Sequence, residues 1–308
     1  MAELDISFDD RVAIVTGAGG GLGRAHALEL ARRGALVVVN DLGGAVDGSG
    51  SSQTAAQKVV DEIVAAGGEA VASYDSVATP EGGEAIVQTA LDAFGRVDIV
   101  INNAGILRDK SFVNMEPDLL NPVVDVHLKG AFYVTRPAWK VMREQGYGRI
   151  VNTASAAGLF GNFGQSNYGA AKMGLVGLTK VLGIEGAKYD IKVNAIAPMA
   201  GTRMTTGLVG DTASAAGEVA EGDRFAPSWV APAVAFLVHQ DCPVSGEVFS
   251  VGMGRVARVF VGVVPGWIAK EMITAEDVRD NFEQIRSEDG YIVPADLMGE
   301  AVFMSDIG

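Results

Sequence analysis

Cysteine and histidine are scarce in this chain, which has one cysteine, Cys242, and three histidines in 308 residues. A single cysteine excludes an intramolecular disulfide and a cysteine-based zinc cluster, and it favours a reducing, cytoplasmic location. No apolar run approaches the length of a membrane span, and the acidic stretch before Arg11 lacks the basic lead of a signal peptide. We therefore expect a protein that is neither exported nor inserted in a membrane.

Basic residues are also few, with 24 lysines and arginines against 38 acidic residues and a formal net charge of −14. Such a charge repels nucleic acids and anionic membrane surfaces, so neither is an expected partner. A ligand that carries phosphate must instead be held by local backbone N–H groups. No set of residues has metal-ligand spacing, and no metal is expected.

Short runs rich in β-branched residues alternate with segments whose apolar residues recur at three-to-four spacing. This alternation predicts an α/β fold, a Rossmann-type doubly wound sheet of about seven parallel strands with helices on both faces. The expected strands are 12–16, 36–40, 69–74, 97–101, 149–154, 191–197 and 246–251. The expected helices are 25–33, 53–66, 81–94, about 118–144, 167–188 and 229–239.

The alternation ends after Gly254, where an apolar, turn-broken stretch is followed by a capped helical pattern over 274–285. We expect residues 1–254 to form one Rossmann-type domain that carries the functional site. Residues 255–308 are expected to form a C-terminal extension, packed on that domain or at a subunit interface.

The densest glycine cluster, TGAGGGLG over residues 16–23, lies between the first expected strand and the first expected helix. In that context the free N–H groups and the helix dipole converge on one point, which can hold a pyrophosphate without any basic side chain. The alternative is a strand-to-helix turn with no ligand.

Asp41 follows the second expected strand, 20 residues after Gly21. A carboxylate there can accept hydrogen bonds from both hydroxyls of an adenosine ribose and repels a 2′-phosphate, so NAD is expected rather than NADP. Alternatively, Asp41 only marks the end of a strand.

Tyr168 and Lys172 are four residues apart on an expected helix and so share one face. A lysine charge beside a tyrosine favours ionisation of its hydroxyl, which helps the tyrosine act as a base near neutral pH. Taken alone, the pair is also typical of a helix tyrosine with a solvated lysine. Ser155, at the end of the fifth expected strand, and Asn102–Gly105, at the end of the fourth, fall at the same edge of the sheet, where open α/β sheets bind ligands.

In this order and spacing, the motifs Thr16-Gly-x-x-x-Gly-x-Gly23, Asn102-Asn-Ala-Gly105, Ser155 and Tyr168-x-x-x-Lys172 resemble the short-chain dehydrogenase/reductase family. The resemblance implies hydride transfer between a nicotinamide and a carbinol or carbonyl carbon, with Tyr168 as base and Ser155 holding the substrate oxygen. It also implies that Asp75 to Val77 contact the adenine and that Lys172 bridges the nicotinamide ribose. The residues expected to bind NAD are Gly17, Gly21, Leu22, Gly23, Asp41, Asp75, Ser76, Val77, Asn103, Ala104, Gly105, Tyr168, Lys172 and Thr202.

His127 stands where the family usually completes its catalytic set with an asparagine. It is either a substitute member of the proton relay or a hydrogen-bonded helix residue with no chemical role. A subfamily with histidine at this position is similar in the segments VVVNDLGG, VHLKGAF and GNFGQSNYGAAK. This subfamily comprises the (3R)-hydroxyacyl-CoA dehydrogenase units of type 2 peroxisomal multifunctional enzymes, also called 17β-hydroxysteroid dehydrogenases type 4, and their stand-alone bacterial relatives.

The substrate implied by this resemblance is a (3R)-3-hydroxyacyl-CoA with a fatty acyl or sterol side chain, and the product is the 3-ketoacyl-CoA. The pocket walls, expected from residues 200–225 and the extension, carry no acyl-CoA motif, so a free hydroxysteroid remains an alternative. A further alternative is a sensor or scaffold that binds NAD without catalysis. Family habit implies a homodimer or a tetramer.

Overall fold

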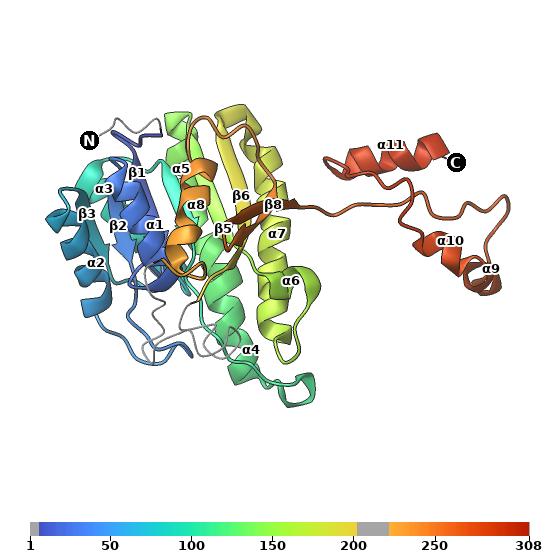
Figure 1. Cartoon of the computed structure of the whole chain (residues 1–308), viewed down its shortest axis with the longest axis horizontal. Helices are drawn as coiled ribbons and strands as arrows, with labels where there is room; N and C mark the ends of the chain where they lie inside the picture. The colour runs from blue at the N-terminus through green and yellow to red at the C-terminus, as the bar shows by residue number, and fades with distance from the viewer. Residues whose placement is uncertain (1–5, 202–221, 308) are drawn as a thin grey trace. The chain divides into compact units, whose positions relative to one another are not determined.

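The fold is built on one eight-stranded sheet in the order β3-β2-β1-β4-β5-β6-β7-β8 (Figure 1). The computed structural model describes residues 6–201 and 222–307. Consecutive neighbours from β3 to β7 pair in parallel, which confirms the predicted doubly wound fold. The strands are β1 (Val12–Thr16), β2 (Leu36–Asn40), β3 (Glu69–Ser73), β4 (Ile99–Asn102), β5 (Gly148–Thr153), β6 (Ile191–Met199), β7 (Val248–Gly252) and β8 (Arg255–Val259).

The eighth strand was not predicted from the sequence. Only Met253 and Gly254 separate β7 from β8, and both have positive φ, 54° and 81°. Two such residues suit a tight hairpin turn, so the sheet continues beyond the point where the parallel alternation ends.

Helices cover both faces of the sheet (Figure 1). One face packs against α1 (Gly21–Arg32), α2 (Thr54–Ala65) and α8 (Ala231–Leu237), and the other against α3 (Pro80–Phe94), α5 (Gly130–Gln145) and α7 (Ser166–Gly186). Each side buries its own apolar cluster, and β1 contributes alternate residues to both, since strand side chains point to opposite faces.

The helix predicted over 118–144 is divided in the structure. It consists of α4 (Pro117–Val124), a π-helical turn (Asp125–Lys129) and α5. A π turn holds one more residue than an α turn, and such turns are frequent at functional sites. His127 lies in this turn. A short helix that was not predicted, α6 (Ala156–Phe160), separates β5 from α7.

Four buried polar side chains link two helices through the two central strands. Asn102 of β4 donates to Thr135 of α5 and to Asn152 of β5, each at 2.9 Å. Asn152 in turn donates to Thr179 of α7, also at 2.9 Å. Because buried amides and hydroxyls are costly without partners, this chain, which we call the amide chain, fixes the positions of α5 and α7 on the sheet.

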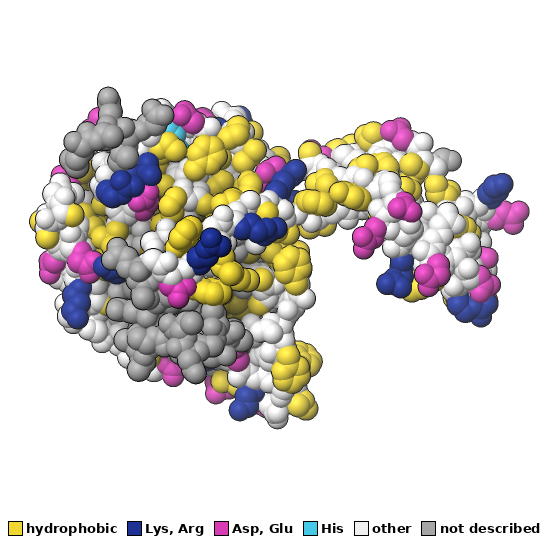
Figure 2. Space-filling view, in the orientation of Figure 1, with side chains coloured by type: hydrophobic (Ala, Val, Ile, Leu, Met, Phe, Trp, Pro, Cys, Tyr) yellow, Lys and Arg dark blue, Asp and Glu magenta, His cyan; other side chains and the backbone are white. Residues whose placement is uncertain are grey.

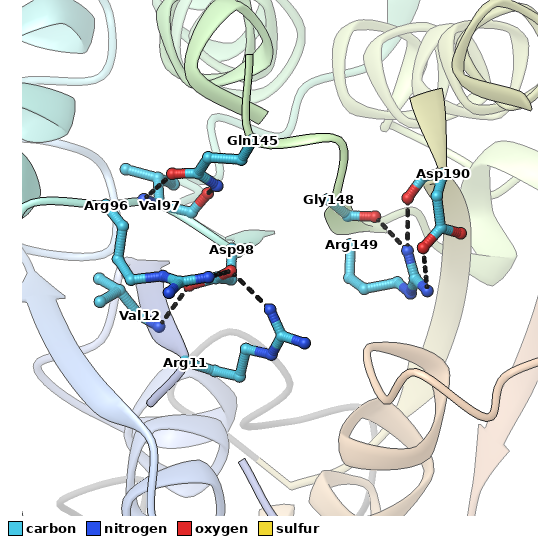
Figure 3. A network of polar contacts seen from close by, with 9 residues as sticks. All are labelled: Arg11, Val12, Arg96, Val97, Asp98, Gln145, Gly148, Arg149 and Asp190. Atoms are coloured by element: carbon cyan, nitrogen blue, oxygen red, sulfur yellow. Dashed lines mark hydrogen bonds and ion pairs between the residues drawn. The ribbon is translucent and has the colours of Figure 1, made fainter. Parts of the chain in front are cut away.

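A second polar network joins the amino ends of the central strands (Figure 3). Asp98 is fully buried and accepts hydrogen bonds from Arg11, from Arg96 and from the Val12 N–H at 2.7–3.1 Å. At β5, the buried Arg149 donates to the Gly148 carbonyl oxygen and to the carbonyl and carboxylate oxygens of Asp190.

Tyr147 joins these two groups. Its ring lies between the guanidinium carbons of Arg11 and Arg149, which are 3.9 and 4.2 Å from the ring centroid. Stacking of this kind stabilises a desolvated guanidinium.

The chain divides into two compact units, residues 1–258 and 259–308. The second contains α9 (Ala275–Asp280), α10 (Phe282–Arg286) and α11 (Leu297–Ile307). A capping box between Thr274 and Asp277 starts α9, as the helical pattern at 274–285 suggested.

On the face drawn in Figure 2, lysine and arginine side chains lie in small groups between acidic and apolar ones. The view shows no extended basic surface among the coloured residues. Within the described ranges, no helix has the length and apolar character needed to cross a bilayer.

Asp98→Ala should lower the free energy of unfolding by about 3 kcal/mol, because two arginines and the Val12 N–H lose their buried acceptor. Urea unfolding of the purified protein measures this. Asp92→Ala, at an exposed position of α3, should leave the midpoint almost unchanged. Equal midpoints for the two variants would contradict the importance of this network.

Candidate active site

The carboxyl ends of five strands bring the expected site residues together in one row. Since the strands are parallel and ordered β3-β2-β1-β4-β5, the segments that follow them lie side by side in the same order. They carry Asp75 to Val77, Asp41, the glycine turn 17–21, Asn103 to Gly105 and Ser155. A row of this kind at the carboxyl edge is where doubly wound sheets bind dinucleotides.

The glycine turn requires glycine at several positions. Gly17 and Gly21 have φ of 63° and 52°, values that favour glycine, and a Cβ on Gly17 would lie 2.7 Å from the Ala104 Cα. A Cβ on Gly23 would lie 2.2 Å from the Gly17 carbonyl oxygen. Gly19 is not among the residues expected to bind NAD, yet a Cβ at this position would lie 2.8 Å from the Asp41 carboxylate.

The turn leads directly into α1. Among the described residues no side chain caps this helix, whose N-cap is Gly20 and which continues with Gly21, Leu22 and Gly23. Uncapped N–H groups at the positive end of a helix dipole form an anion site. The backbone here therefore fits the pyrophosphate of a dinucleotide without help from a basic side chain.

Thr16 and Asn103 lock the end of β1 to the end of β4. The Thr16 hydroxyl accepts from the N–H groups of Asn103 and Ala104 at 3.0 and 3.1 Å. The Asn103 amide donates to the Thr16 and Gly17 carbonyl oxygens at 3.0 and 3.1 Å. The glycine turn and the segment Asn103–Gly105 therefore form one rigid surface.

Asp41 directly follows β2 and does more than end a strand. One carboxylate oxygen accepts from the Gly19 N–H at 2.8 Å and the other from the Gly43 N–H at 2.6 Å. The carboxylate thus joins the glycine turn to the loop 42–53, which we call the rim loop. Carboxylate oxygens have further lone pairs, so these bonds leave room for a ribose hydroxyl.

The rim loop also reaches the loop after β4. The Leu107 N–H donates to the Val46 carbonyl oxygen at 2.9 Å. The Arg108 guanidinium donates to the backbone carbonyl oxygen of Asp47 at 2.8 Å. Because β1 lies between β2 and β4, these contacts span the end of β1, where the glycine turn begins.

The three residues after β3 differ in exposure. Asp75 is exposed and its carbonyl oxygen accepts from Asn40, Ser76 is half-buried, and Val77 is buried. Thr202, the last expected cofactor residue, lies outside the described residues.

Ser155 and Tyr168 meet at the end of β5. Ser155 caps α6 by accepting from the Ala157 N–H at 3.1 Å, and its side chain is near enough to Tyr168 to lower the pKa of the tyrosine. Burial raises the pKa of Tyr168 above its ordinary value, and Ser155 opposes that rise. The sequence led us to expect Lys172 to lower this pKa, but in the structure desolvation is its largest cause, and the charged or polar groups that shift it are Ser155 and Asp109.

Lys172 lies on the same face of α7 as Tyr168. It is 3% exposed, and its Nζ is 5.5 Å from the Tyr168 ring centroid and 2.5 Å from the Thr153 carbonyl oxygen, to which it donates. Burial lowers the pKa of Lys172 to about 7. The alternative of a solvated lysine is therefore wrong, and the amine is poised between its charged and neutral forms near pH 7.

His127 is buried against Tyr168, with the two rings edge to face and their centroids 5.0 Å apart. Its Nε2 lies 3.0 Å from the Ile106 nitrogen and 2.8 Å from the Ile106 carbonyl oxygen. Burial, reinforced by Lys172, holds the pKa of His127 well below its ordinary value, so the ring is neutral at physiological pH.

A cavity of about 10 Å³, room for roughly one water molecule, lies between His127 and Lys172. Thr16 and Asn102 also line it. Among the described residues, the buried His127 Nδ1 and Thr153 Oγ1 have no hydrogen-bond partner. Such atoms suit a site that a polar ligand completes.

Sequence reasoning missed two buried amides that hold the start of α7. Gln165 donates to Asp109 at 2.7 Å, and Asn167 donates to the carbonyl oxygens of Arg108 and Leu119. Both residues lie in the segment GNFGQSNYGAAK, so the signal was present, but nothing in it indicates what their side chains contact.

Residues 11–212 match the family model described as short chain dehydrogenase. The chain belongs to this family. The expected dehydrogenase fold and enzyme class are therefore confirmed, and the row of residues described above lies in a short-chain dehydrogenase.

The dehydrogenase is similar to parts of larger proteins and to a protein of its own size. It is 54% identical over 250 residues, 81% of the chain, to the peroxisomal hydratase-dehydrogenase-epimerase of Saccharomyces cerevisiae, of which it covers 27%. It is also 54% identical over 81% of its length to a short-chain type dehydrogenase/reductase of Mycobacterium tuberculosis, of which it covers 85%.

Among solved structures, full-length peroxisomal multifunctional enzyme type 2 of Drosophila melanogaster is similar with a TM-score of 0.79 and 36% identity. The alignment covers 98% of this chain and 50% of the fly protein. The dehydrogenase thus spans half or less of the two peroxisomal relatives named here.

Lys172→Met should stabilise the cofactor-free protein near pH 7, because the folded state no longer buries an amine with a lowered pKa. Each pKa unit by which burial lowers the Lys172 pKa corresponds to about 1.4 kcal/mol of gained stability. Loss of the hydrogen bond to the Thr153 carbonyl oxygen reduces this gain. The unfolded lysine holds its proton more firmly, so the gain should shrink as the pH rises from about 7 towards 10.5.

Thermal unfolding between these pH values measures the effect. Lys180→Met, two turns further along α7 at a partly exposed position, is the matched control. A pH-independent difference between the parent and Lys172→Met would show that burial does not lower this pKa.

Proposed function

We propose that this dehydrogenase uses NAD to oxidise a secondary alcohol to a ketone, reversibly, and that its substrate is a (3R)-3-hydroxyacyl-CoA. The observation that carries the proposal is the meeting of Ser155, Tyr168 and the buried Lys172 beside an uncapped glycine turn. The hydroxyacyl-CoA substrate is supported by similarity to proteins named as multifunctional enzymes and as a hydratase-dehydrogenase-epimerase.

The loops after β4 and β5 support a substrate with a long apolar part. A bridge between Lys110 and Gln165 brings them together, and they expose Phe112, Phe160 and Phe163 by 83%, 75% and 91%. Both loops follow the carboxyl ends of strands and so lie on the proposed substrate side. An acyl chain or a sterol side chain can cover such aromatic surface.

NAD would be held by the glycine turn, by Asp41 and Asp75–Val77 around the adenosine, and by Asn103–Gly105 with Lys172 around the nicotinamide ribose. When bound, it supplies the acceptor for the hydride that leaves the carbinol carbon. Tyr168 takes the proton of the substrate hydroxyl, and Ser155 donates a hydrogen bond to the same oxygen. The Ser155 side chain is near enough to Tyr168 to lower its pKa, so one substrate oxygen can contact both hydroxyls.

Lys172 has two functions in this proposal. Its ammonium form stabilises the tyrosinate and binds ribose hydroxyls, so cofactor placement and base strength depend on one group. His127, neutral and packed on the Tyr168 ring, holds that ring in place and does not transfer a proton. The reaction needs no metal ion.

Location and assembly remain predictions. The single cysteine favours the cytoplasm, whereas two of the relatives reported above carry the word peroxisomal in their names. A homodimer or tetramer is the expected assembly, with the extension 255–308 packed on its own domain or at a subunit interface. Light scattering measures the subunit number.

Tyr168→Phe should reduce turnover at least about 100-fold while the dissociation constant for NAD changes less than about twofold. The assay follows nicotinamide reduction with (3R)- and (3S)-3-hydroxyacyl-CoAs and with free hydroxysteroids. Tyr189→Phe, at the amino edge of the sheet, should retain parent activity. Parent turnover by Tyr168→Phe would overturn the mechanism.

The substrate panel also separates the alternatives. Turnover of the (3R) thioesters and not of free steroids supports the proposal, and the reverse identifies a hydroxysteroid dehydrogenase. Binding of NAD without turnover of any compound would instead indicate a sensor or scaffold.

NAD should bind at least about tenfold more tightly than NADP, a difference of about 1.4 kcal/mol, because Asp41 repels a 2′-phosphate. Calorimetric titration of both oxidised cofactors measures the preference. Tighter binding of NADP would contradict the role given to Asp41.

A further inference from the structure

The side chain of Asn167 is one of the most enclosed polar groups near the proposed site. It is 1% exposed and makes three hydrogen bonds. Its amide nitrogen donates to the carbonyl oxygens of Arg108 and Leu119 at 3.0 and 2.9 Å, and its amide oxygen accepts from the Tyr168 N–H at 2.7 Å.

These bonds connect three separate pieces of chain. Arg108 lies in the loop after β4, Leu119 in α4, and Tyr168 in the first turn of α7. N–H groups in the first turn of a helix have no partner within the helix, and Asn167 supplies one to the tyrosine itself. Figure 1 shows α4 and the amino end of α7 at the same end of the fold.

The other side of Tyr168 is reached from the same loop. Ile106, two residues before Arg108, is hydrogen-bonded to His127, whose ring packs edge to face on the Tyr168 ring. A closed circuit of contacts therefore runs from the Tyr168 backbone through Asn167, the loop and His127 back to the Tyr168 ring.

We propose that Asn167 is a positioning residue, which fixes the Tyr168 hydroxyl by tying the start of α7 to the loop after β4. The inference rests on the proposed function of Tyr168 as the base. A displacement of about 1 Å at a reacting group can cost 100-fold in rate, so an anchor on the adjacent residue controls the chemical step rather than substrate binding.

A purely structural role predicts a different result. Loss of Asn167 removes a donor from two carbonyl oxygens and the acceptor of the Tyr168 N–H, which lowers stability in either case. Only a positioning role also lowers kcat in the folded enzyme while leaving the affinity for NAD unchanged, because the glycine turn and Asp41 do not contact Asn167.

The experiment compares Asn167→Ala with Asn194→Ala. Asn194 is a matched control, since it is also fully buried, donates to the Val244 carbonyl oxygen at 3.0 Å and accepts from the Glu247 N–H at 3.2 Å. It lies on β6, and among the described residues its side chain forms no hydrogen bond with a residue of the proposed site.

Both variants should lose thermal stability. At a temperature where both are folded, Asn167→Ala should show a kcat about 10- to 100-fold below that of the parent, with KM and the dissociation constant for NAD within about threefold. Asn194→Ala should keep the parent kcat. Parent kcat in Asn167→Ala, or an equal loss in Asn194→Ala, would overturn the proposal.

A second measurement needs no substrate. The difference in tyrosinate absorption between each protein and its Tyr168→Phe derivative reports the ionisation of Tyr168 alone. Asn167→Ala should bring the pKa of Tyr168 down towards its ordinary value, because the released side chain gains access to water. An unchanged titration would count against the anchor, whereas failure of the parent to oxidise any test alcohol would count only against the proposed function.

Discussion

The amide chain Thr135–Asn102–Asn152–Thr179 connects the parts of the dehydrogenase on which the proposed chemistry depends. Asn102 and Asn152 lie on adjacent strands and are hydrogen-bonded to each other. Asn102 also bonds to α5 and Asn152 to α7, and both helices lie on the same side of the sheet. One of these helices follows the π turn of His127, and the other carries Tyr168 and Lys172. Buried amides tolerate only arrangements that satisfy them, so this chain sets the distance between the two groups of side chains.

The groups that stabilise the fold and the groups proposed for the chemistry lie at opposite edges of the sheet. At the amino edge, arginines surround Asp98 and Tyr147, and each charged side chain drawn in Figure 3 has a hydrogen-bond partner. At the carboxyl edge, Lys172 is buried at a cost, and the His127 Nδ1 is without a partner among the described residues. The carboxyl edge thus carries buried polar groups that lower stability and that a ligand can hydrogen-bond. The polar network at the amino edge offsets this loss of stability.

The strands were predictable because their signal is local. Near-continuous apolar runs are typical of buried parallel strands, and on this basis residues 12–16 and 36–40 were predicted as strands. β1 and β2 have the predicted bounds. The row of site residues followed from the topology. The π turn, α6, the need for glycine at position 19 and the contacts of Asn167 were not predictable, because each depends on partners distant in sequence. The pKa of Tyr168 was misjudged for the same reason, since spacing reveals the neighbour Lys172 but not the burial of both side chains.

The bonds between Thr16 and Asn103 have a consequence for the folding of the nascent chain. Their partners are 87 residues apart, and β1 pairs with β4 only after β2, β3 and three helices have been synthesised. An amino-terminal fragment that stops before β4 contains the whole glycine turn but lacks the surface that supports it. Closure of this long loop is entropically costly and slow, so the glycine turn stays without its supporting surface until β4 has been synthesised and has paired with β1.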